Sequence, residues 1–416
     1  MLNSRQSHAF TLLGDLTGMQ VVEKTSYHVR MLQGRISPAL PELFAPMAAR
    51  ISNAMKQNFP QDTERGWTAI KPLPATVLCF SEGIAMALYG AKMAGNPRLV
   101  QLTYELTQDV FKVAFAMRCI PSILQPFLVW LLPAKWRMLR GWRELGSFVV
   151  PEVLRQKEAN NNPKTESHNP SPDLVTWMVQ DGRTKLERDP DVLTTLCGSV
   201  AAGSTYSIAN FVCRTLSDLV AHPDVLEAVR AEIHAKNASL VQSNGGRWDL
   251  AALGGLDRLE SAMKETARLA PGTLIVYSRV VQHDCVLDGV ELRKGQFITM
   301  SGPGRAMDPA IFEEPKVYKG LRFCADDKTL EEHRARPFRN VDTDILTWGA
   351  GRWACPGRQL ADMAAKIVLV KLVDEYEFAL IGGKQLKPNC VHEFLFFHPD
   401  NKLLVQRRKD AVGIKF

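Results

Sequence analysis

The sequence predicts a mainly α-helical protein with a small β part. Two observations carry this prediction: a long stretch of helical composition near the middle of the chain, and short runs rich in Val, Ile and Tyr after residue 272. The chain has 416 residues, of which 46% are hydrophobic and 23% charged, and this composition indicates a folded globular protein rather than a disordered one.

The N-terminal part, residues 20–160, is predicted to form helices separated by Pro-rich joints. It contains an apolar run at 120–132, which two prolines interrupt and a basic run follows. This run is shorter than the roughly 20 apolar residues that a membrane-spanning helix needs. We interpret it as a core helix with bent ends. The alternative is a short segment that dips into one face of a bilayer.

The clearest helix begins at the Asp-Pro-Asp sequence 189–191, which offers a capping residue, a proline at the first helical position and acid in the first turn. Helical composition continues to His222, over about 32 residues or about 48 Å. Residues 196–210 carry no charge. We therefore expect a buried helix through the centre of the molecule.

The polar, Pro-rich segment at 158–172 predicts an exposed loop, and a second polar break at 237–246 precedes the next helical stretch. From 272 to 301, apolar β-branched runs alternate with turn pairs, and similar runs recur at 394–397 and 403–406. These runs predict the short strands of the β part.

Charge and cysteine usage exclude some classes of protein. The net charge of +7 and the pI of about 8.9 come from a mild basic excess along the chain, which does not predict nucleic-acid binding but suits an acidic partner. The eight cysteines are scattered, with no CxxC pair and no zinc-type Cys/His cluster, and the chain starts without a signal peptide. We therefore expect a reducing compartment and no disulfide framework.

Residues 348–361, WGAGRWACPGRQLA, combine a Gly-rich turn, a cysteine and the start of an apolar helix. Gly349 and Gly351 permit backbone angles that other residues avoid. At a helix N-terminus, Cys355 meets unpaired N–H groups and a positive dipole end, which lower the thiol pKa and favour the thiolate that an iron ligand must be. Gly357 leaves room for a flat ligand. The alternative is a buried structural cysteine.

This stretch closely resembles the haem-binding loop of the cytochrome P450 superfamily, particularly of its fungal microsomal members. Their loop has an aromatic residue, a glycine, a basic residue and a second glycine around the cysteine, which fall here on Trp348, Gly351, Arg352 and Gly357. The resemblance implies a haem b cofactor with Cys355 as the axial thiolate ligand, in a single domain over residues 1–416.

Two further motifs match the family in the right order. Glu265 and Arg268, three residues apart, resemble its buried ion pair on a helix. Arg322, which follows Tyr318, resembles the arginine that completes this network, and buried charges need such multiple partners. We expect these residues to be structural rather than catalytic.

The long helix, at about 190–222, resembles the family's oxygen-binding helix. Thr205 stands in the place of the hydroxyl residue that helps deliver protons to oxygen, and a mid-helix hydroxyl can bond back to the preceding turn. Ser204 replaces the usual neighbouring acid, which leaves the details of the proton relay open. The alternative is that small residues merely let this helix pack closely.

Four positions correspond to haem contacts in the family. Arg279 lies where the family often places a partner of a haem propionate, and a guanidinium binds a carboxylate well. Arg352 and the indole N–H of Trp353 offer similar donors. His28 falls in the helix that contacts haem, and the alternative is an ordinary polar histidine.

The resemblance runs from about residue 14 to the C-terminus and omits the family's beginning, which holds a membrane anchor, a hinge, the first helix and most of the first β-sheet. We therefore expect an N-terminally truncated cytochrome P450 fold. In the chain as written, an unpaired sheet edge and exposed apolar surface would result. A truncated gene model, a splice product and a real short protein are all consistent with this start.

The resemblance implies a monooxygenase that inserts one atom of O2 into an apolar small molecule, in fungal secondary-metabolite biosynthesis. Electrons would come from NADPH through a cytochrome reductase docked beside the cysteine loop, where Arg352, Arg358 and Lys366 supply charge. One alternative is a haem-thiolate isomerase, dehydratase or ring-forming enzyme, which Ser204 permits. Another is a remnant without activity.

The family resemblance also implies a location on the cytosolic face of the endoplasmic reticulum membrane. The chain as written shows no anchor and would then be cytoplasmic.

Overall fold

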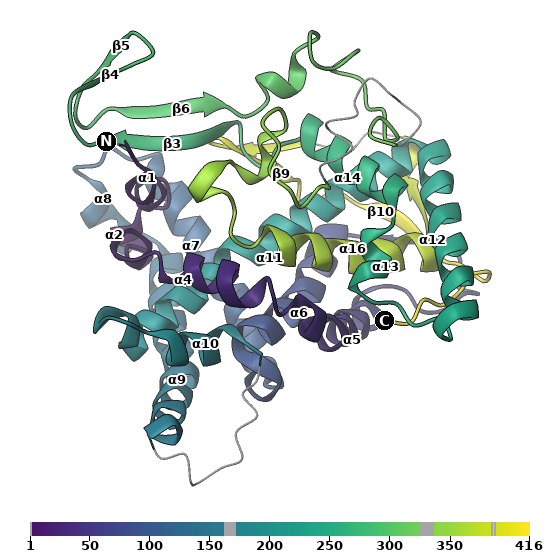
Figure 1. Cartoon of the computed structure of the whole chain (residues 1–416), viewed down its shortest axis with the longest axis horizontal. Helices are drawn as coiled ribbons and strands as arrows, with labels where there is room; N and C mark the ends of the chain where they lie inside the picture. Colours follow the sequence, from purple (N-terminus) through teal and green to yellow (C-terminus); the bar gives the residue numbers. More distant parts are fainter. Residues whose placement is uncertain (1, 162–171, 325–336, 384–385, 387) are drawn as a thin grey trace. The chain divides into compact units, whose positions relative to one another are not determined.

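The computed structural model describes residues 2–161, 172–324, 337–383, 386 and 388–416 (Figure 1). Helices dominate and the strands are short, as predicted. Backbone contacts group the chain into two compact units. Unit 1 holds residues 1–39, 84–205 and 277–300, and unit 2 holds residues 40–83, 206–276 and 301–416. Most of the predicted 158–172 loop lies outside the described residues, and the single domain stays a prediction.

Unit 1 is mainly helical. Its helices are α1 (Ser4–Thr11), α2 (Gly14–Thr17), α3 (Val21–Lys24), α4 (Tyr27–Met31), the π-helical η1 (Leu32–Ile36), α7 (Pro97–Arg118), α8 (Gln125–Leu128), α9 (Pro133–Asn161) and α10 (Leu174–Asp181). Helices α7 and α9 pack together, and Leu106 of α7 and Leu145 of α9 are fully buried. They approach closely at Gly141, where an added Cβ would lie 3.2 Å from Leu106 Cδ1.

The predicted strands of residues 272–301 are present. They are β3 (Ile275–Val281), the hairpin β4 (Cys285–Leu287) with β5 (Val290–Leu292), and β6 (Phe297–Ser301). The short β1 (Leu2–Asn3) pairs only with Val280 and Val281, so most of that edge of β3 has no strand partner among the described residues. Val286 and Val290 of the hairpin are exposed.

The interpretation of residues 120–132 as a core helix is wrong. The prolines restrict this region to the four-residue α8 and the 3-10 turn η2 (Val129–Leu131), so no long helical face exists that the core could cover. The side chains of Ile123, Phe127 and Leu131 are instead largely exposed.

The long central helix is confirmed as α11 (Pro190–Ala221), with 32 residues. The Asp189 carboxylate caps it by accepting from the backbone N–H of Asp191 at 2.9 Å and of Val192 at 3.3 Å. Most of its uncharged middle is buried, as expected, but Gly203 is exposed. Residues of α11 up to 205 belong to unit 1, and the rest belong to unit 2.

Unit 2 is built around α16 (Arg358–Glu375), which packs against three helices of this unit. These three are α5 (Leu40–Asn58), α12 (Pro223–Asn244) and α13 (Leu250–Gly254), and α14 (Asp257–Leu269) also belongs to unit 2. Because α12 continues to Asn244, most of the polar break predicted at 237–246 is helical, and that prediction is wrong for residues 237–244. Four consecutive apolar residues from Ile367 to Val370 are fully buried, so α16 is covered on every face. Helix α6 (Pro72–Ala94), like α11, contributes to both units.

Two antiparallel sheets complete unit 2. One has the order β2 (Thr68–Ile70), β10 (Leu403–Arg407), β7 (Tyr376–Leu380), and the other is the pair β8 (Pro388–Val391) and β9 (Phe394–Phe397). The predicted strands at 394–397 and 403–406 are therefore confirmed. Strand β7 follows α16 directly, so this sheet continues the buried core of the unit.

Candidate functional site

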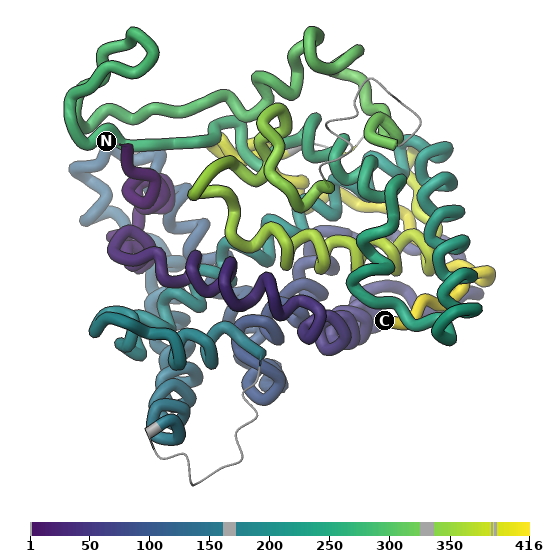
Figure 2. The backbone as a smooth tube through the Cα atoms, in the orientation of Figure 1, coloured from purple at the N-terminus to yellow at the C-terminus, as the bar shows by residue number. Residues whose placement is uncertain are grey.

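The candidate site in unit 2 is the loop that delivers Cys355 to the start of α16. Figure 2 traces the backbone of this part of the chain in yellow-green. Two single 3-10 turns, Leu346–Trp348 and Gly351–Trp353, fold this loop. The backbone N–H of Cys355 donates to the carbonyl oxygen of Trp348 at 2.7 Å, which closes the loop. Gly349 and Gly351 have φ angles of +70° and +63°, so the prediction that they adopt glycine-specific backbone is confirmed.

Cys355 is partly buried and lies two residues ahead of Gly357, the N-cap of α16. Burial raises the pKa of its thiol above the ordinary value, while hydrogen bonds from the backbone N–H groups of Gly357 and Arg358, and the charge of Arg358, lower it. Burial prevails, so the predicted lowering of the pKa is wrong for the polypeptide alone. A metal cation at the sulfur would supply the charge that stabilises a thiolate.

The surroundings of Cys355 fit a flat prosthetic group. A Cβ added at Gly351 or Gly357 would meet nothing within 4 Å, so open space borders the loop on both sides of the cysteine. Arg358 donates from Nη1 to the Cys355 carbonyl oxygen at 3.0 Å, but its Nε is buried without a hydrogen-bond partner among the described residues. An unpaired buried donor and unfilled space are what a missing acidic group would leave.

Arg352 and Trp353 lie on the same loop. Arg352 is exposed, its guanidinium carbon lies 5.6 Å from the centre of the Trp353 ring, and no described carboxylate pairs with it. Cys355, Arg352, Trp353 and Gly357 are therefore neighbours in unit 2, as their spacing requires. Their roles toward haem stay predictions.

Aromatic side chains pack against this loop. The Trp348 indole N–H donates to the Phe338 carbonyl oxygen, and the two ring centroids lie 5.0 Å apart. The Phe338 ring stacks on Phe211 of α11 at 4.7 Å. Sequence reasoning missed Phe338, because a single phenylalanine far from the loop belongs to no local pattern.

Lys366 does not supply surface charge, so its predicted role in docking a reductase is wrong. Its side chain is 1% exposed and forms ion pairs with Asp362 at 3.1 Å and with Glu260 of α14. Lys366 is buried because α16 is covered on every face. The same pairing keeps the ammonium charged, because burial lowers the pKa of Lys366 but both carboxylates raise it, and the net direction is upward.

The predicted charge network in unit 2 is confirmed. Arg268 donates from Nε and Nη2 to the Glu265 carboxylate at 2.8 and 2.7 Å, and Arg322 Nε donates to both Glu265 oxygens at 3.1 Å. Arg268 also reaches the carbonyl oxygens of Ala306 and Pro315. All three charged side chains are at most 4% exposed, so this network holds the fold and offers no surface to a substrate.

Thr205 and Ser204 lie on the part of α11 that belongs to unit 1. A bond back to the preceding turn is expected of Thr205, but among the described residues it is made by Ser204, whose hydroxyl donates to the Val200 carbonyl oxygen at 2.8 Å. Thr205 is 2% exposed. Beside them Gly203 faces open space, since an added Cβ would meet nothing within 4 Å. A larger side chain at Gly203 would therefore meet no neighbouring atom.

Arg279 and His28 also belong to unit 1. Arg279 donates to the Ser278 carbonyl oxygen at 2.8 Å, and burial lowers its pKa because no described carboxylate pairs with it. Burial and the nearby charge of His8 lower the pKa of His28 to about 4, so its ring is neutral at pH 7. Its Nδ1 is buried and has no hydrogen-bond partner among the described residues. The Arg279 guanidinium and the His28 ring could each form a hydrogen bond with an additional polar group.

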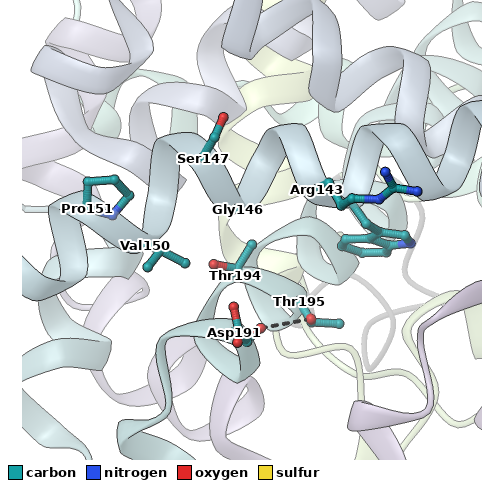
Figure 3. Close-up of a pocket in the computed structure, with 9 residues that line it drawn as sticks. Arg143, Gly146, Ser147, Val150, Pro151, Asp191, Thr194 and Thr195 are labelled. Atoms are coloured by element: carbon teal, nitrogen blue, oxygen red, sulfur yellow. Dashed lines mark hydrogen bonds between the residues drawn. The ribbon is translucent and has the colours of Figure 1, made fainter.

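An open groove of about 550 Å³ lies between α9 and α11 in unit 1 (Figure 3). None of the predicted site residues lines it. The Thr195 hydroxyl that faces it donates to the Asp191 carbonyl oxygen of its own helix at 2.9 Å. Its lining therefore offers no nucleophile paired with a base, and the groove is not a candidate active site.

The cytochrome P450 family profile matches residues 23–405. A protein named cytochrome P450 monooxygenase AN1598, from Emericella nidulans, is 28% identical over 98% of this chain and 75% of its own length. An ent-kaurene oxidase from Gibberella intermedia is 26% identical over 95% of this chain and 73% of its own length. The crystal structure of the cytochrome P450DA haem domain matches with a TM-score of 0.73 and 16% identity, covering 98% of this chain and 84% of that one.

Proposed function

The chain belongs to the cytochrome P450 family, and from this membership we propose that it inserts one oxygen atom of O2 into an apolar small molecule in fungal secondary metabolism, with Cys355 as the iron ligand. The predicted family, fold, monooxygenase class and haem cofactor are confirmed. The residue roles, the substrate and the partner below are proposals.

The observation that carries the proposal is the geometry of the Cys355 loop. The Cys355–Trp348 hydrogen bond and the glycine-specific turns fix the sulfur ahead of α16, and open space at Gly351 and Gly357 borders it. When bound, haem supplies the oxygen chemistry, which a thiolate ligand favours. The polypeptide provides the ligand, and the N–H groups of Gly357 and Arg358 hydrogen-bond the sulfur.

Haem carries two carboxylates, and three side-chain donors among the described residues suit them. The partly buried guanidinium of Arg279, the exposed guanidinium of Arg352 and the indole N–H of Trp353 would bind these propionates. His28 is neutral and would contribute a hydrogen bond rather than a charge.

Thr205 and Ser204 are proposed to hold the hydroxyl groups through which protons reach the oxygen chemistry. The Ser204 hydroxyl donates its hydrogen bond to the Val200 carbonyl oxygen. It can therefore accept a further hydrogen bond, but unlike the acid it replaces it cannot act as a proton donor to oxygen. The presence of Ser204 in place of an acid also supports the second candidate, a haem-thiolate isomerase, dehydratase or ring-forming enzyme, because such reactions need no proton delivery to O2.

Electrons would come from NADPH through a cytochrome reductase. With Lys366 buried and Arg358 turned to the Cys355 carbonyl, Arg352 is the exposed cation of the predicted three that an acidic partner would meet. The substrate class is proposed as apolar, and similarity to a protein named ent-kaurene oxidase supports an enzyme of secondary metabolism.

We also propose that the enzyme works at the cytosolic face of the endoplasmic reticulum membrane. Two helices of the described residues, α6 and α11, are long and apolar enough to cross a membrane, and both are mostly buried inside the protein. Burial of this kind is the usual state of a core helix.

The test is the reduced carbon-monoxide difference spectrum of the expressed chain. Wild type should show the shifted Soret band of thiolate-ligated haem, Cys355→Ala should lose it, and Cys390→Ala, which alters an exposed cysteine of the same unit, should keep it. A Soret shift that survives Cys355→Ala would refute the ligand assignment. NADPH-dependent oxygen uptake with a reductase then separates the monooxygenase from the second candidate, and absence of any haem binding would indicate the remnant.

A further inference from the structure

A second buried ion cluster of unit 2, apart from the Glu265 network, joins α14 to α16. At its centre the Lys366 ammonium, 1% exposed, pairs with Asp362 of its own helix at 3.1 Å and with Glu260 of α14. Arg339 lies 3.9 Å from the Asp362 carboxylate. A buried charge needs partners in fixed positions, so this cluster holds the two helices and residue 339 in place.

The Glu260 carboxylate has a further partner. Its Oε2 accepts from Lys366, whereas its Oε1 accepts from the backbone N–H of Phe338. Phe338 is 4% exposed, and its ring stacks on Phe211 of α11 at 4.7 Å with the two ring planes 9° apart. The backbone and the side chain of Phe338 are thus both fixed, by two helices that are distant from it in the sequence.

From Phe338 the hydrogen bonds continue to the cysteine. The Trp348 indole N–H donates to the Phe338 carbonyl oxygen, and the backbone N–H of Cys355 donates to the Trp348 carbonyl oxygen at 2.7 Å. Three consecutive hydrogen bonds therefore connect Glu260 to Cys355. We call this chain of four residues, Glu260, Phe338, Trp348 and Cys355, the Glu260 tether.

The Cys355 loop has little regular structure of its own. It consists of two single 3-10 turns of three residues each, and Gly349 and Gly351 have positive φ angles. Short 3-10 turns have poorer hydrogen-bond geometry than an α-helix, so they hold a side chain weakly by themselves. A ligand group needs support from the residues around it, because a looseness of about 1 Å impairs a site. The Glu260 tether offers this support from the buried core.

We propose that Glu260 is a positioning residue for the sulfur ligand of the iron. Through the Glu260 tether it holds the backbone of Cys355, and Lys366 fixes the carboxylate that does so. This rests on the proposed role of Cys355 as the ligand. A wild type without the shifted Soret band would refute that role, whereas a wild-type result in the Glu260 variants would refute the tether alone.

The first test measures how fast the shifted Soret band of the reduced carbon-monoxide complex converts to the unshifted band of haem that has lost its thiolate. The haem-loaded chain is kept at a low, fixed urea concentration at which far-UV circular dichroism still reports folded protein. Glu260→Met removes the acceptor of the Phe338 N–H and should speed the conversion roughly tenfold or more, as loss of a group that supports a metal ligand typically does.

Glu260→Gln is the conservative variant that should rescue the site. It loses the same charge as Glu260→Met but keeps an oxygen that can accept from the Phe338 N–H, so its conversion rate should stay within about twofold of wild type. Equal rates in the two variants would overturn the proposal, because the Phe338 bond would then have no part in holding the ligand.

Lys371→Met is the matched control for lost stability. Lys371 lies on α16 with its side chain 8% exposed, and it pairs with Glu375 four residues along the helix, at the same spacing as Lys366 and Asp362. It is not part of the Glu260 tether, so Lys371→Met should lower the free energy of unfolding in urea and still convert at about the wild-type rate. The proposal is wrong if Lys371→Met, at an equal loss of stability, converts as fast as Glu260→Met.

Trp348→Phe tests the middle of the tether without altering a buried charge. Phenylalanine keeps a ring against Phe338 but lacks the indole N–H, so conversion should be roughly fivefold faster, the factor that one neutral hydrogen bond contributes. Because both variants break one chain, Glu260→Met combined with Trp348→Phe should convert no faster than the faster single variant. Rates that multiply would overturn the proposal. If Glu260→Met does not bind haem, a wild-type rate in Trp348→Phe is sufficient to refute it.

Discussion

The backbone N–H of Cys355 lies 2.7 Å from the carbonyl oxygen of Trp348, and the loop that this bond closes turns at Gly349. Gly349 has φ +70° and ψ −168°, a combination open essentially to glycine alone. Gly357, on the other side of the cysteine, has φ −93°, which any residue adopts. The two glycines therefore act differently: Gly349 shapes the backbone, whereas Gly357 leaves space.

Alanine at these two positions should separate the two roles. Gly349→Ala should lower the free energy of unfolding of the haem-free chain by about 1–3 kcal/mol through backbone strain. Gly357→Ala should change it by less than about 0.5 kcal/mol, because the added Cβ meets nothing within 4 Å, yet it should speed haem loss by filling space that haem needs. Urea unfolding and haem transfer to apomyoglobin measure the two effects. Equal destabilisation by both variants would show that Gly349 is not strained.

Removing the carboxylate charge of Glu265 should destabilise unit 2 strongly. Glu265→Gln leaves Arg268 and Arg322 buried without their counter-charge, and breaking such a buried network costs roughly 3–5 kcal/mol. Asp181→Asn breaks the more exposed Arg35–Asp181 pair and should cost about 1 kcal/mol or less. Chemical denaturation of the two variants provides the comparison. If they lose the same amount, the Glu265 network does not stabilise the fold as its burial implies.

The elements that sequence reasoning located correctly are those with local signals. Helix α11 has a capping aspartate, a proline at its start and an uncharged middle, and all of these are readable within one segment. The turns at Gly349 and Gly351 follow from a motif of adjacent residues. The Glu265–Arg268 pair follows from helical spacing, and its third member Arg322 from family resemblance rather than from the residues alone.

Two of the errors have one physical cause, which is burial by distant parts of the chain. Lys366 is predicted to supply surface charge because it is a lysine near the cysteine loop, but the residue that pairs with it, Glu260, is 106 positions away. Burial also reverses the pKa direction expected for Cys355 from its helix alone. Conversely, residues 120–132 are apolar enough for a core, but their prolines prevent a buriable helix. No local pattern reports how many elements cover a given position.

Asp218 gives unit 2 a pH-dependent stability. Burial raises the pKa of its carboxyl group from 3.8 to about 6, although the Thr266 hydroxyl and the charges of His222 and Arg214 oppose this; the charge of Glu265 adds to it. Because the folded chain binds this proton more tightly than the unfolded chain, the contribution of Asp218 to the free energy of unfolding falls as the pH rises from about 4 to about 6 and is constant above.

Asp218→Asn should therefore stabilise the protein at pH 7.5, by up to about 2–3 kcal/mol, and have little effect below pH 4. The asparagine side chain can still accept from Thr266, whose hydroxyl lies 2.7 Å from Asp218 Oδ2. Thermal or urea unfolding of wild type and variant across this pH range measures the difference. A stabilisation that does not change between pH 4 and pH 7.5 would exclude titration of Asp218 as its cause.

The substitution Arg279→Gln should weaken haem retention without lowering the stability of the haem-free chain. Without haem its guanidinium is partly buried and has no described carboxylate partner, so Arg279→Gln should leave the stability of the haem-free chain unchanged or slightly higher. With haem, loss of a charge-assisted bond to a propionate should speed haem dissociation roughly 10- to 100-fold, while the Soret band stays in place because the sulfur ligand is intact. Arg143→Gln, an exposed arginine of the same unit, is the matched control. Equal rates of haem transfer to apomyoglobin from the two variants would mean that Arg279 does not hold a propionate.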